Sequence, residues 1–295
     1  MNDETPYRQR EQVRRAFDAA ADRYEESAVL QREVGERLLQ RLDLIRLQPG
    51  LVVDLGAGTG LQTDALRRRY RKAQVVALDL SGNMLRQARR HGTWLRPVPA
   101  VQASLDQLPL APQSVDLLFS SMSFQWSEDP QRLFRECHRV LRPGGLLLFS
   151  TVGPDTLREL RESWQAVDDA DHVNRFPDMH DLGDALVRAR FGDPVMDMEP
   201  FTLTYPELRG LFQDLRRIGA NTVRGHRRGG LLGRAAWQRL ETAYSAYRRA
   251  DGRLPATWEV VYGHAWASGE QPQERRDDGA VVIPLDGIRV RRRSS

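Results

Sequence analysis

The sequence predicts an α/β fold with a doubly wound, mostly parallel sheet, and three observations support this prediction. From residue 51 onward, short apolar runs alternate with amphipathic segments, an order that favours parallel strands joined by helices. A glycine-rich turn follows the first apolar run, and Pro143-Gly144-Gly145 separates a later helix from another apolar run. Helices are therefore expected on both faces of the sheet.

The first half of the sheet is predicted element by element. The expected strands are 51–55, 74–79, 98–103, 114–120 and 146–151. The expected helices run from the glycine turn to about residue 71, from residue 81 to about residue 90, and over 132–141. Cys137 stands at helical spacing from Leu133 and Val140, which predicts a side chain that faces the core.

After the fifth strand the pattern is less regular. Helices are expected at 156–167 and 179–189, then a strand at 195–203, and residues 206–250 are largely helical around an arginine- and glycine-rich loop at 224–233. Alternating aromatic and small residues predict a late strand at 258–266. If that strand joins the sheet, residues 152–177 and 206–253 are insertions over its carboxyl edge, where ligands of such sheets bind. These two helical insertions are called the lid below.

The chain is expected to divide into three parts. Residues 1–45 form an N-terminal helical segment, residues 46–266 form the main domain with its lid, and residues 267–295 form a polar tail that we expect to be flexible.

Composition excludes several classes of protein. With 40% hydrophobic and 28% charged residues and no apolar run near the length of a bilayer span, the chain is expected to lie in the cytoplasm without a membrane partner. Cys137 is the only cysteine, so no intrachain disulfide or cysteine zinc site is expected, and no metal is predicted. The net charge is +4, and no zinc-finger spacing or basic heptad helix is present, so no nucleic-acid partner is predicted.

The glycine-rich turn is the most informative segment. Gly56, Gly58 and Gly60 follow Asp54 with a spacing that differs from the glycine pattern of dinucleotide sites and of P-loops. Asp54 would repel a pyrophosphate, but it could hold the cationic amino group of an amino-acid-like ligand, directly or through water. Asp79 ends the second strand, where a carboxylate can accept both hydroxyls of a ribose.

Together these features resemble the motifs of class I S-adenosylmethionine-dependent methyltransferases, which have a Rossmann-like fold. The resemblance also includes Met84 as an apolar wall for adenine, Leu108-Pro109 after the third strand and Leu141–Gly145 before the fifth. It implies S-adenosylmethionine as methyl donor. Ser104 is a departure, because such enzymes often place there an aspartate that accepts from the adenine amino group. Either Ser104 or nearby backbone takes this contact, or the affinity is reduced.

Over residues 10–266 the resemblance narrows to the malonyl-acyl-carrier-protein O-methyltransferases of biotin biosynthesis. The segments that carry it are Ala16-Phe17, Ala20-Ala21, Tyr24, Leu30-Gln31-Arg32, Gln125-Trp126, Glu159-Leu160, Trp164-Gln165-Ala166-Val167-Asp168, His172 with Asn174-Arg175-Phe176, Ile218-Gly219-Ala220 and 255–263. The family implies methylation of the free carboxyl of a malonyl thioester held by an acyl carrier protein. This ester would resemble a fatty-acid primer on the route to pimelate.

Four residues are predicted to act on the substrate. Arg175 is the first candidate to bind the malonyl carboxylate, with a structural ion pair as its alternative. His172 could bind the thioester or carboxylate, or else cap or pack locally. Gln125 should face the reacting centre from the carboxyl edge of the fourth strand. Tyr24 could close over the cofactor, although packing alone is equally compatible with its position.

Gln31 is grouped with the cofactor-binding residues, because it lies with Tyr24 on the N-terminal segment expected over the methionine portion of the cofactor.

Two other functions remain open. Related proteins that assist assembly of respiratory complex I share the Gly-x-Asp-Thr-Leu stretch seen approximately at residues 153–157 and modify a protein arginine. The chain could also be a noncatalytic cofactor-binding module. Methylation of a nucleobase is disfavoured, because the turn after the fourth strand reads Ser120-Ser121-Met122-Ser123-Phe124 and lacks the Pro-Pro-aromatic motif.

Overall fold

The computed structural model describes residues 4–127, 129–220 and 233–268. It confirms the doubly wound α/β fold, with a seven-stranded sheet in the order β3-β2-β1-β4-β5-β7-β6. The strands are β1 (Leu51–Leu55), β2 (Gln74–Asp79), β3 (Ala100–Gln102), β4 (Val115–Ser120), β5 (Leu141–Val152), β6 (Phe191–Tyr205) and β7 (Leu254–Ala267). Strands β1 to β5 are parallel, and β7 runs antiparallel between β5 and β6.

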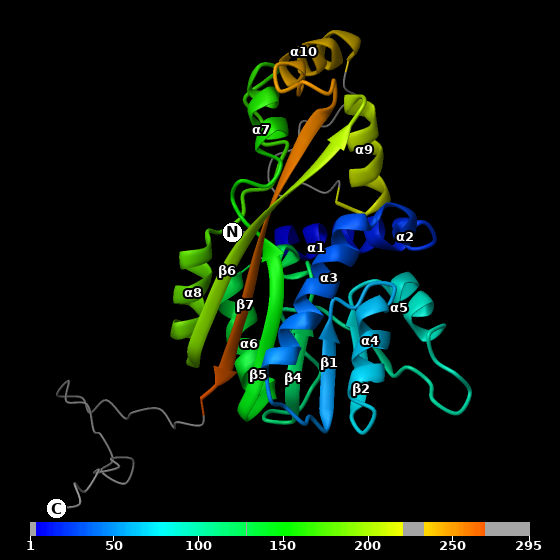
Figure 1. Cartoon of the computed structure of the whole chain (residues 1–295), viewed down its shortest axis with the longest axis vertical. Helices are drawn as coiled ribbons and strands as arrows, with labels where there is room; N and C mark the ends of the chain where they lie inside the picture. Colours follow the sequence, from blue (N-terminus) through cyan, green and yellow to red (C-terminus); the bar gives the residue numbers. More distant parts are fainter. Residues whose placement is uncertain (1–3, 128, 221–232, 269–295) are drawn as a thin grey trace, which may run out of the picture.

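The helices alternate with the first strands as expected, and three of the later helices gather at one end of the sheet (Figure 1). They are α1 (Glu4–Ala20), α2 (Tyr24–Ser27), α3 (Val29–Arg41), α4 (Leu61–Arg69), α5 (Gly82–Arg89), α6 (Pro130–Val140), α7 (Arg158–Gln165), α8 (Met179–Arg188), α9 (Leu208–Arg217) and α10 (Arg234–Ser245). In Figure 1, α7, α9 and α10 surround the ends of β6 and β7 that extend beyond the rest of the sheet. None of the described helices combines the length and apolarity needed to cross a bilayer.

One predicted boundary is wrong in an informative way. The sequence predicts that Pro143-Gly144-Gly145 separates a helix from a strand that begins at residue 146. In the structure, β5 already begins at Leu141. The pairing with β4 changes register between Leu141 and Leu146, and Gly144 has φ +76°. The Pro-Gly-Gly segment is therefore an irregularity within the strand, of the kind that a glycine with positive φ permits.

The late strand does join the sheet, and the outer pair is longer than predicted. β6 and β7 pair from Phe191↔Ala267 to Tyr205↔Leu254, and β7 also pairs with β5 from Leu146↔Trp266 to Val152↔Val260. The cross-strand pairing extends beyond the segments of alternating apolar residues from which the two strands are predicted. The predicted loop at 224–233 lies almost wholly outside the described residues, as does the tail beyond residue 268.

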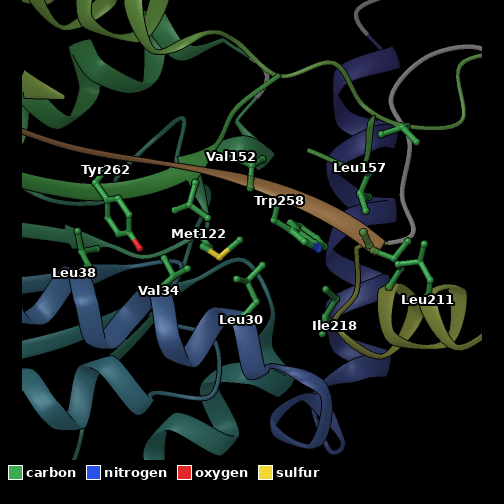
Figure 2. Packing of buried hydrophobic residues seen from close by; sticks show 14 of the residues in the cluster. Leu30, Val34, Leu38, Met122, Val152, Leu157, Leu211, Ile218, Trp258 and Tyr262 are labelled. Carbon is green, nitrogen blue, oxygen red and sulfur yellow. The ribbon is translucent and has the colours of Figure 1, made fainter. Parts of the chain in front are cut away.

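The core lies on both faces of the sheet. Neighbouring residues of one strand enter different clusters, as Val260 and Val261 do, because successive side chains of a strand point to opposite faces. Lid residues such as Leu157 and Leu211 belong to the same cluster as Leu30 and Val34 of α3 (Figure 2). The lid is therefore packed onto the sheet and shares its core.

Candidate active site

The glycine turn bends the chain sharply between β1 and α4. Gly56, Gly58 and Gly60 all have positive φ, between +54° and +89°. A Cβ on Gly60 would lie 2.7 Å from Ala88, so this glycine permits close packing of α5. A Cβ on Gly58 would meet no atom within 4 Å, because Gly58 borders open space. Gly56 and Gly58 line the same cavity, of about 90 Å³.

Asp79 holds this turn from the end of β2. Its Oδ2 accepts the Gly58 N–H at 2.9 Å, and its Oδ1 accepts the Ser81 N–H at 2.7 Å. Burial raises the pKa of Asp79 to about 6, although both backbone hydrogen bonds lower it. Asp79, Met84 and Ser104 line the 90 Å³ cavity together, and the Met84 side chain is only 1% exposed. The structure thus brings an acid, an apolar wall and the glycine turn to one place, as the sequence predicted.

The N-terminal helix covers this cavity, which is called the cofactor cavity below. Phe17 of α1 lines it, and Asp18 on the next position accepts the Ser81 hydroxyl at 2.6 Å and the Asn83 N–H at 3.2 Å. The Ser81 hydroxyl in turn accepts the Met84 N–H and caps α5. The start of α5 is therefore hydrogen-bonded to α1, and these bonds hold α1 over the cavity.

Asp54 lies behind the glycine turn. Its side chain is 1% exposed, and its Oδ2 accepts the Thr63 hydroxyl at 2.6 Å. Burial raises the pKa of Asp54 to about 7, against the Thr63 hydrogen bond, which lowers it. Asp54 is not among the residues that line the described cavities. Its contact with a ligand stays a prediction.

A second cavity of about 200 Å³ lies under the lid, and is called the lid cavity below. Its walls are mostly apolar and come from α7, α9, β7 and the N-terminal segment. They include Val152, Leu157, Leu160, Trp164, Phe176, Phe212, Leu215, Ile218 and Trp258. Phe17, Tyr24, Met122 and Trp126 line both the lid cavity and the cofactor cavity. The two cavities therefore meet at these four side chains.

Met122 has an unusual backbone at this meeting point. Its φ is +49°, a value that residues other than glycine rarely adopt. Its N–H donates to the Ser150 carbonyl at 3.0 Å and its carbonyl accepts the Gln125 amide at 2.6 Å. These bonds hold the thioether side chain between the cavities, where Figure 2 shows it facing Leu30 and Val34.

The predicted substrate residues differ in where they lie. His172 lines the lid cavity, stacks on Trp164 with ring centroids 3.6 Å apart, and places its Nε2 2.7 Å from the Asp168 carboxylate. Gln125 also lines it, with its amide bound to Met122 and to the Thr151 hydroxyl. Both side chains are therefore oriented by the protein itself.

Tyr24 and Gln31 lie together beside the glycine turn. Tyr24 lines both main cavities and a smaller one next to Gly58 that Gln31 shares. Burial raises the pKa of Tyr24 well above its ordinary value, with the charge of Asp79 contributing. The Gln31 Oε1 is buried and has no hydrogen-bond partner among the described residues.

Arg175 is placed differently from its predicted neighbours. Asn174 and Phe176 on either side of it line the lid cavity, but Arg175 does not, and its side chain is 85% exposed. Its nearest ion-pair partner is Asp171, at 3.8 Å. Within the described residues, no arginine or lysine lines the lid cavity. The carboxylate-binding role of Arg175 stays a prediction.

Asp106 and Trp258 line these cavities but are not among the site residues predicted from the sequence. Asp106 lines the cofactor cavity with a side chain that is 7% exposed, and it accepts from the Ser127 hydroxyl. The acid that is lacking at Ser104 thus occurs two residues later in the same loop. Trp258 lines the lid cavity from β7, and only its place in the late strand could have pointed to it.

Comparisons with known proteins point to one family. A family model described as a methyltransferase domain matches residues 53–149. The malonyl-[acyl-carrier protein] O-methyltransferase of Laribacter hongkongensis is 50% identical, covering 94% of this chain and 96% of that protein. That of Halorhodospira halophila is 51% identical, covering 95% and 96%.

Solved structures support the fold. The YcgJ protein of Bacillus subtilis is similar with a TM-score of 0.57 and 14% identity, covering 80% of this chain and 99% of that one. A SAM-dependent methyltransferase from Thermotoga maritima has a TM-score of 0.51 and 18% identity, covering 87% and 100%. With the sequence relatives at about half identity over nearly their whole length, the chain belongs to the malonyl-[acyl-carrier protein] O-methyltransferase family.

Proposed function

We propose that this protein transfers the methyl group of S-adenosylmethionine to the free carboxylate of a malonyl thioester borne by an acyl carrier protein. The observation that carries the proposal is the meeting of the two cavities at Phe17, Tyr24, Met122 and Trp126. One cavity offers the groups expected for an adenosyl ligand, and the other offers a covered apolar chamber for an acyl group. The malonyl methyltransferase names of the relatives support the same substrate.

The residues of the cofactor cavity fit S-adenosylmethionine. The Asp79 carboxylate faces the cavity beside the glycine turn, Met84 supplies an apolar wall, and Gly58 leaves free space where a side chain would stand. Gln31 lines the smaller cavity beside Gly58, and its unpartnered Oε1 is a suitable acceptor for the ammonium group of the methionine portion. When bound, S-adenosylmethionine supplies an electrophilic methyl group on a cationic sulfur.

The reaction requires little proton chemistry from the protein. A malonyl carboxylate is ionised near neutral pH, so one of its oxygens forms the new O–C bond as the S–C bond breaks, and no base has to remove a proton. Proximity and alignment alone can supply about 7–11 kcal/mol. The apolar lid walls exclude water. Met122, fixed by its backbone bonds, shapes the junction, and Gln125, fixed by its amide, lines the lid cavity.

The negative charge of the substrate needs compensation when it leaves water. Arg175 is our candidate, because it stands between two cavity-lining residues and an arginine can grip one carboxylate oxygen while the other stays free to react. Its exposed position means that the segment must turn inward when substrate binds. The resulting ester no longer pairs with the guanidinium, which favours release.

Mass spectrometry tests the proposal. Malonyl-carrier protein incubated with S-adenosylmethionine should gain one methylene unit, whereas acetyl-carrier protein, which lacks the free carboxyl, should gain none. Malonyl-coenzyme A measures the importance of the carrier. No gain on either malonyl thioester would contradict the proposal, as would an equal gain on the acetyl form.

Three further predictions follow the family resemblance. The product would be the primer for the pimeloyl moiety of biotin, and the enzyme would act in the cytoplasm without a nucleic-acid partner. The carrier protein is expected to meet the protein near the lid.

A further inference from the structure

Trp258 lines the lid cavity and carries an unused hydrogen-bond donor. The residue is 6% exposed and lines the cavity. Its indole Nε1 is fully buried and has no acceptor among the described residues. Leaving a buried donor unpaired is costly, and buried polar groups that stay unpaired at a binding site are explained when a ligand pairs with them. Figure 2 shows the indole among the apolar side chains of the cavity, between Met122 and Ile218.

The strand holds this indole in place from both sides. Thr257, one residue earlier, donates its N–H at 3.1 Å and its hydroxyl to the buried carboxylate of Glu159. Glu259, one residue later, accepts the Asp155 N–H at 2.7 Å. Because successive side chains of a strand point to opposite faces, these two residues bind Glu159 of α7 and the turn before that helix, while Trp258 faces the other way. The strand that carries the indole is therefore anchored before any substrate arrives.

The position of Trp258 indicates which substrate atom it meets. Trp258 lines the lid cavity but not the cofactor cavity, whereas Met122 and Tyr24 line both. The carboxylate that accepts the methyl group must lie at the junction of the cavities, so the rest of the malonyl group extends into the lid cavity. The thioester carbonyl is the next hydrogen-bond acceptor along that group, and it is neutral, as the indole donor is.

We propose that the indole N–H of Trp258 donates a hydrogen bond to the thioester carbonyl of the bound acyl substrate and so selects for a thioester. This inference rests on the proposed function. A consequence is that the free protein carries the unpaired donor at a cost to its own stability, and recovers that cost only when substrate binds.

Two substrates and two variants test the role. The substrates are malonyl-pantetheine and the 2-carboxyethyl thioether of pantetheine, which keeps the carboxylate but lacks the carbonyl. The variants are Trp258→Phe and Trp237→Phe. Trp237 is a matched control, because its indole nitrogen is also buried without a partner among the described residues, but it does not line the lid cavity.

We expect the wild-type protein and Trp237→Phe to prefer the thioester by about tenfold in kcat/KM, and Trp258→Phe to lose this preference. The ratio of two substrates within one variant cancels differences in the amount of folded protein. Trp258→Phe removes an unpaired donor but also leaves a void where the larger ring stood, so its melting temperature is measured to verify that the variant is folded. Replacement of Trp258 by benzothienylalanine, which exchanges the N–H for sulfur at nearly the same volume, gives the same readout if the phenylalanine variant folds poorly.

The outcomes are distinct. An unchanged thioester preference in either replacement of Trp258 would overturn this assignment alone, and so would an equal loss in Trp237→Phe. Absence of turnover by the wild-type protein with both malonyl-pantetheine and malonyl-carrier protein would overturn the proposed function itself and this assignment with it.

Discussion

The cofactor cavity and the lid cavity are assembled in different ways. The cofactor cavity is built around the glycine turn after β1, with α1 and the loops after β3 and β4 completing its wall, and its key contacts are backbone hydrogen bonds to Asp79. The lid cavity draws on α1, α7, α9 and β7, which are far apart in the sequence. The glycine turn of the cofactor cavity depends on local backbone chemistry, whereas the lid cavity depends on long-range packing. A substitution in one cavity should therefore leave binding at the other intact enough to be measured.

The largest effect separating the two regions is expected from Gly58→Ala. The added methyl group would stand in the cofactor cavity at φ +54°, and we expect affinity for S-adenosylhomocysteine to fall about thirtyfold, as for an overfilled site. Gly144→Ala is a matched control, since it also has open space and a positive φ of +76° but lies in β5 away from the cavities. Each variant should lose about 1 kcal/mol of stability through backbone strain.

Calorimetry with S-adenosylhomocysteine, together with thermal melting, checks this pair. Equal affinities in the two alanine variants would show that Gly58 does not border the ligand.

A smaller effect is expected from pH and would sharpen the role of Asp79. Its pKa, about 6, stands above the ordinary 3.8 because of burial. If the ribose contact needs the carboxylate, acidification from pH 7 to pH 5 should lower S-adenosylhomocysteine affinity about tenfold. Stability has the opposite sign: a raised folded-state pKa favours the folded protein below the unfolded value, and this contribution is lost as pH rises through about 6.

Titration calorimetry across this range, with Asp79→Asn as the control, measures the effect. The variant should bind weakly at every pH without the acid dependence. If the affinity of Asp79→Asn still falls on acidification, another titrating group controls the binding, and Asp54 is the first candidate.

The smallest effect is expected from Glu159→Gln and concerns the lid. The two oxygens of the buried Glu159 carboxylate accept one hydrogen bond each from the N–H and the hydroxyl of Thr257. In glutamine an NH₂ group replaces one of these oxygens, and that group donates hydrogen bonds but cannot accept them. We expect a severalfold loss in kcat/KM for the malonyl thioester with unchanged cofactor affinity. Glu162→Gln, an exposed change on the same helix whose carboxylate accepts the Tyr247 hydroxyl, should have little effect. A matching loss of cofactor affinity in Glu159→Gln would show that the two regions are not separable.

The contrast also explains what could be predicted from the sequence. The glycine turn, Asp79 and Met84 are fixed by a strand, a turn and a helix in immediate succession, and their spacing is visible in the sequence. Ser104 shows the limit of such reading, because the acid of that loop is provided two residues later by Asp106. A motif position locates the loop but not the residue of the loop that carries the carboxylate.

The lid cavity was predicted in outline only. His172 and Gln125 line it, but Arg175, in the same segment as His172, has its side chain turned to solvent. Sequence resemblance transfers a segment, while the direction of each side chain depends on packing between distant elements. Trp258 was missed for the same reason, since its environment is created by lid segments that come from elsewhere in the chain.

The position of β7 has a consequence for how the protein is made. β7 is the hydrogen-bonding partner of both β5 and β6 and carries the residues that anchor α7. Strands β1 to β4 pair only with strands that leave the ribosome before β7 does. Because pairing between distant segments is slow and must await synthesis of both, we expect the nascent chain to form its cofactor turn first. The enclosed substrate chamber would then be completed only when the last described strand inserts between two strands already made.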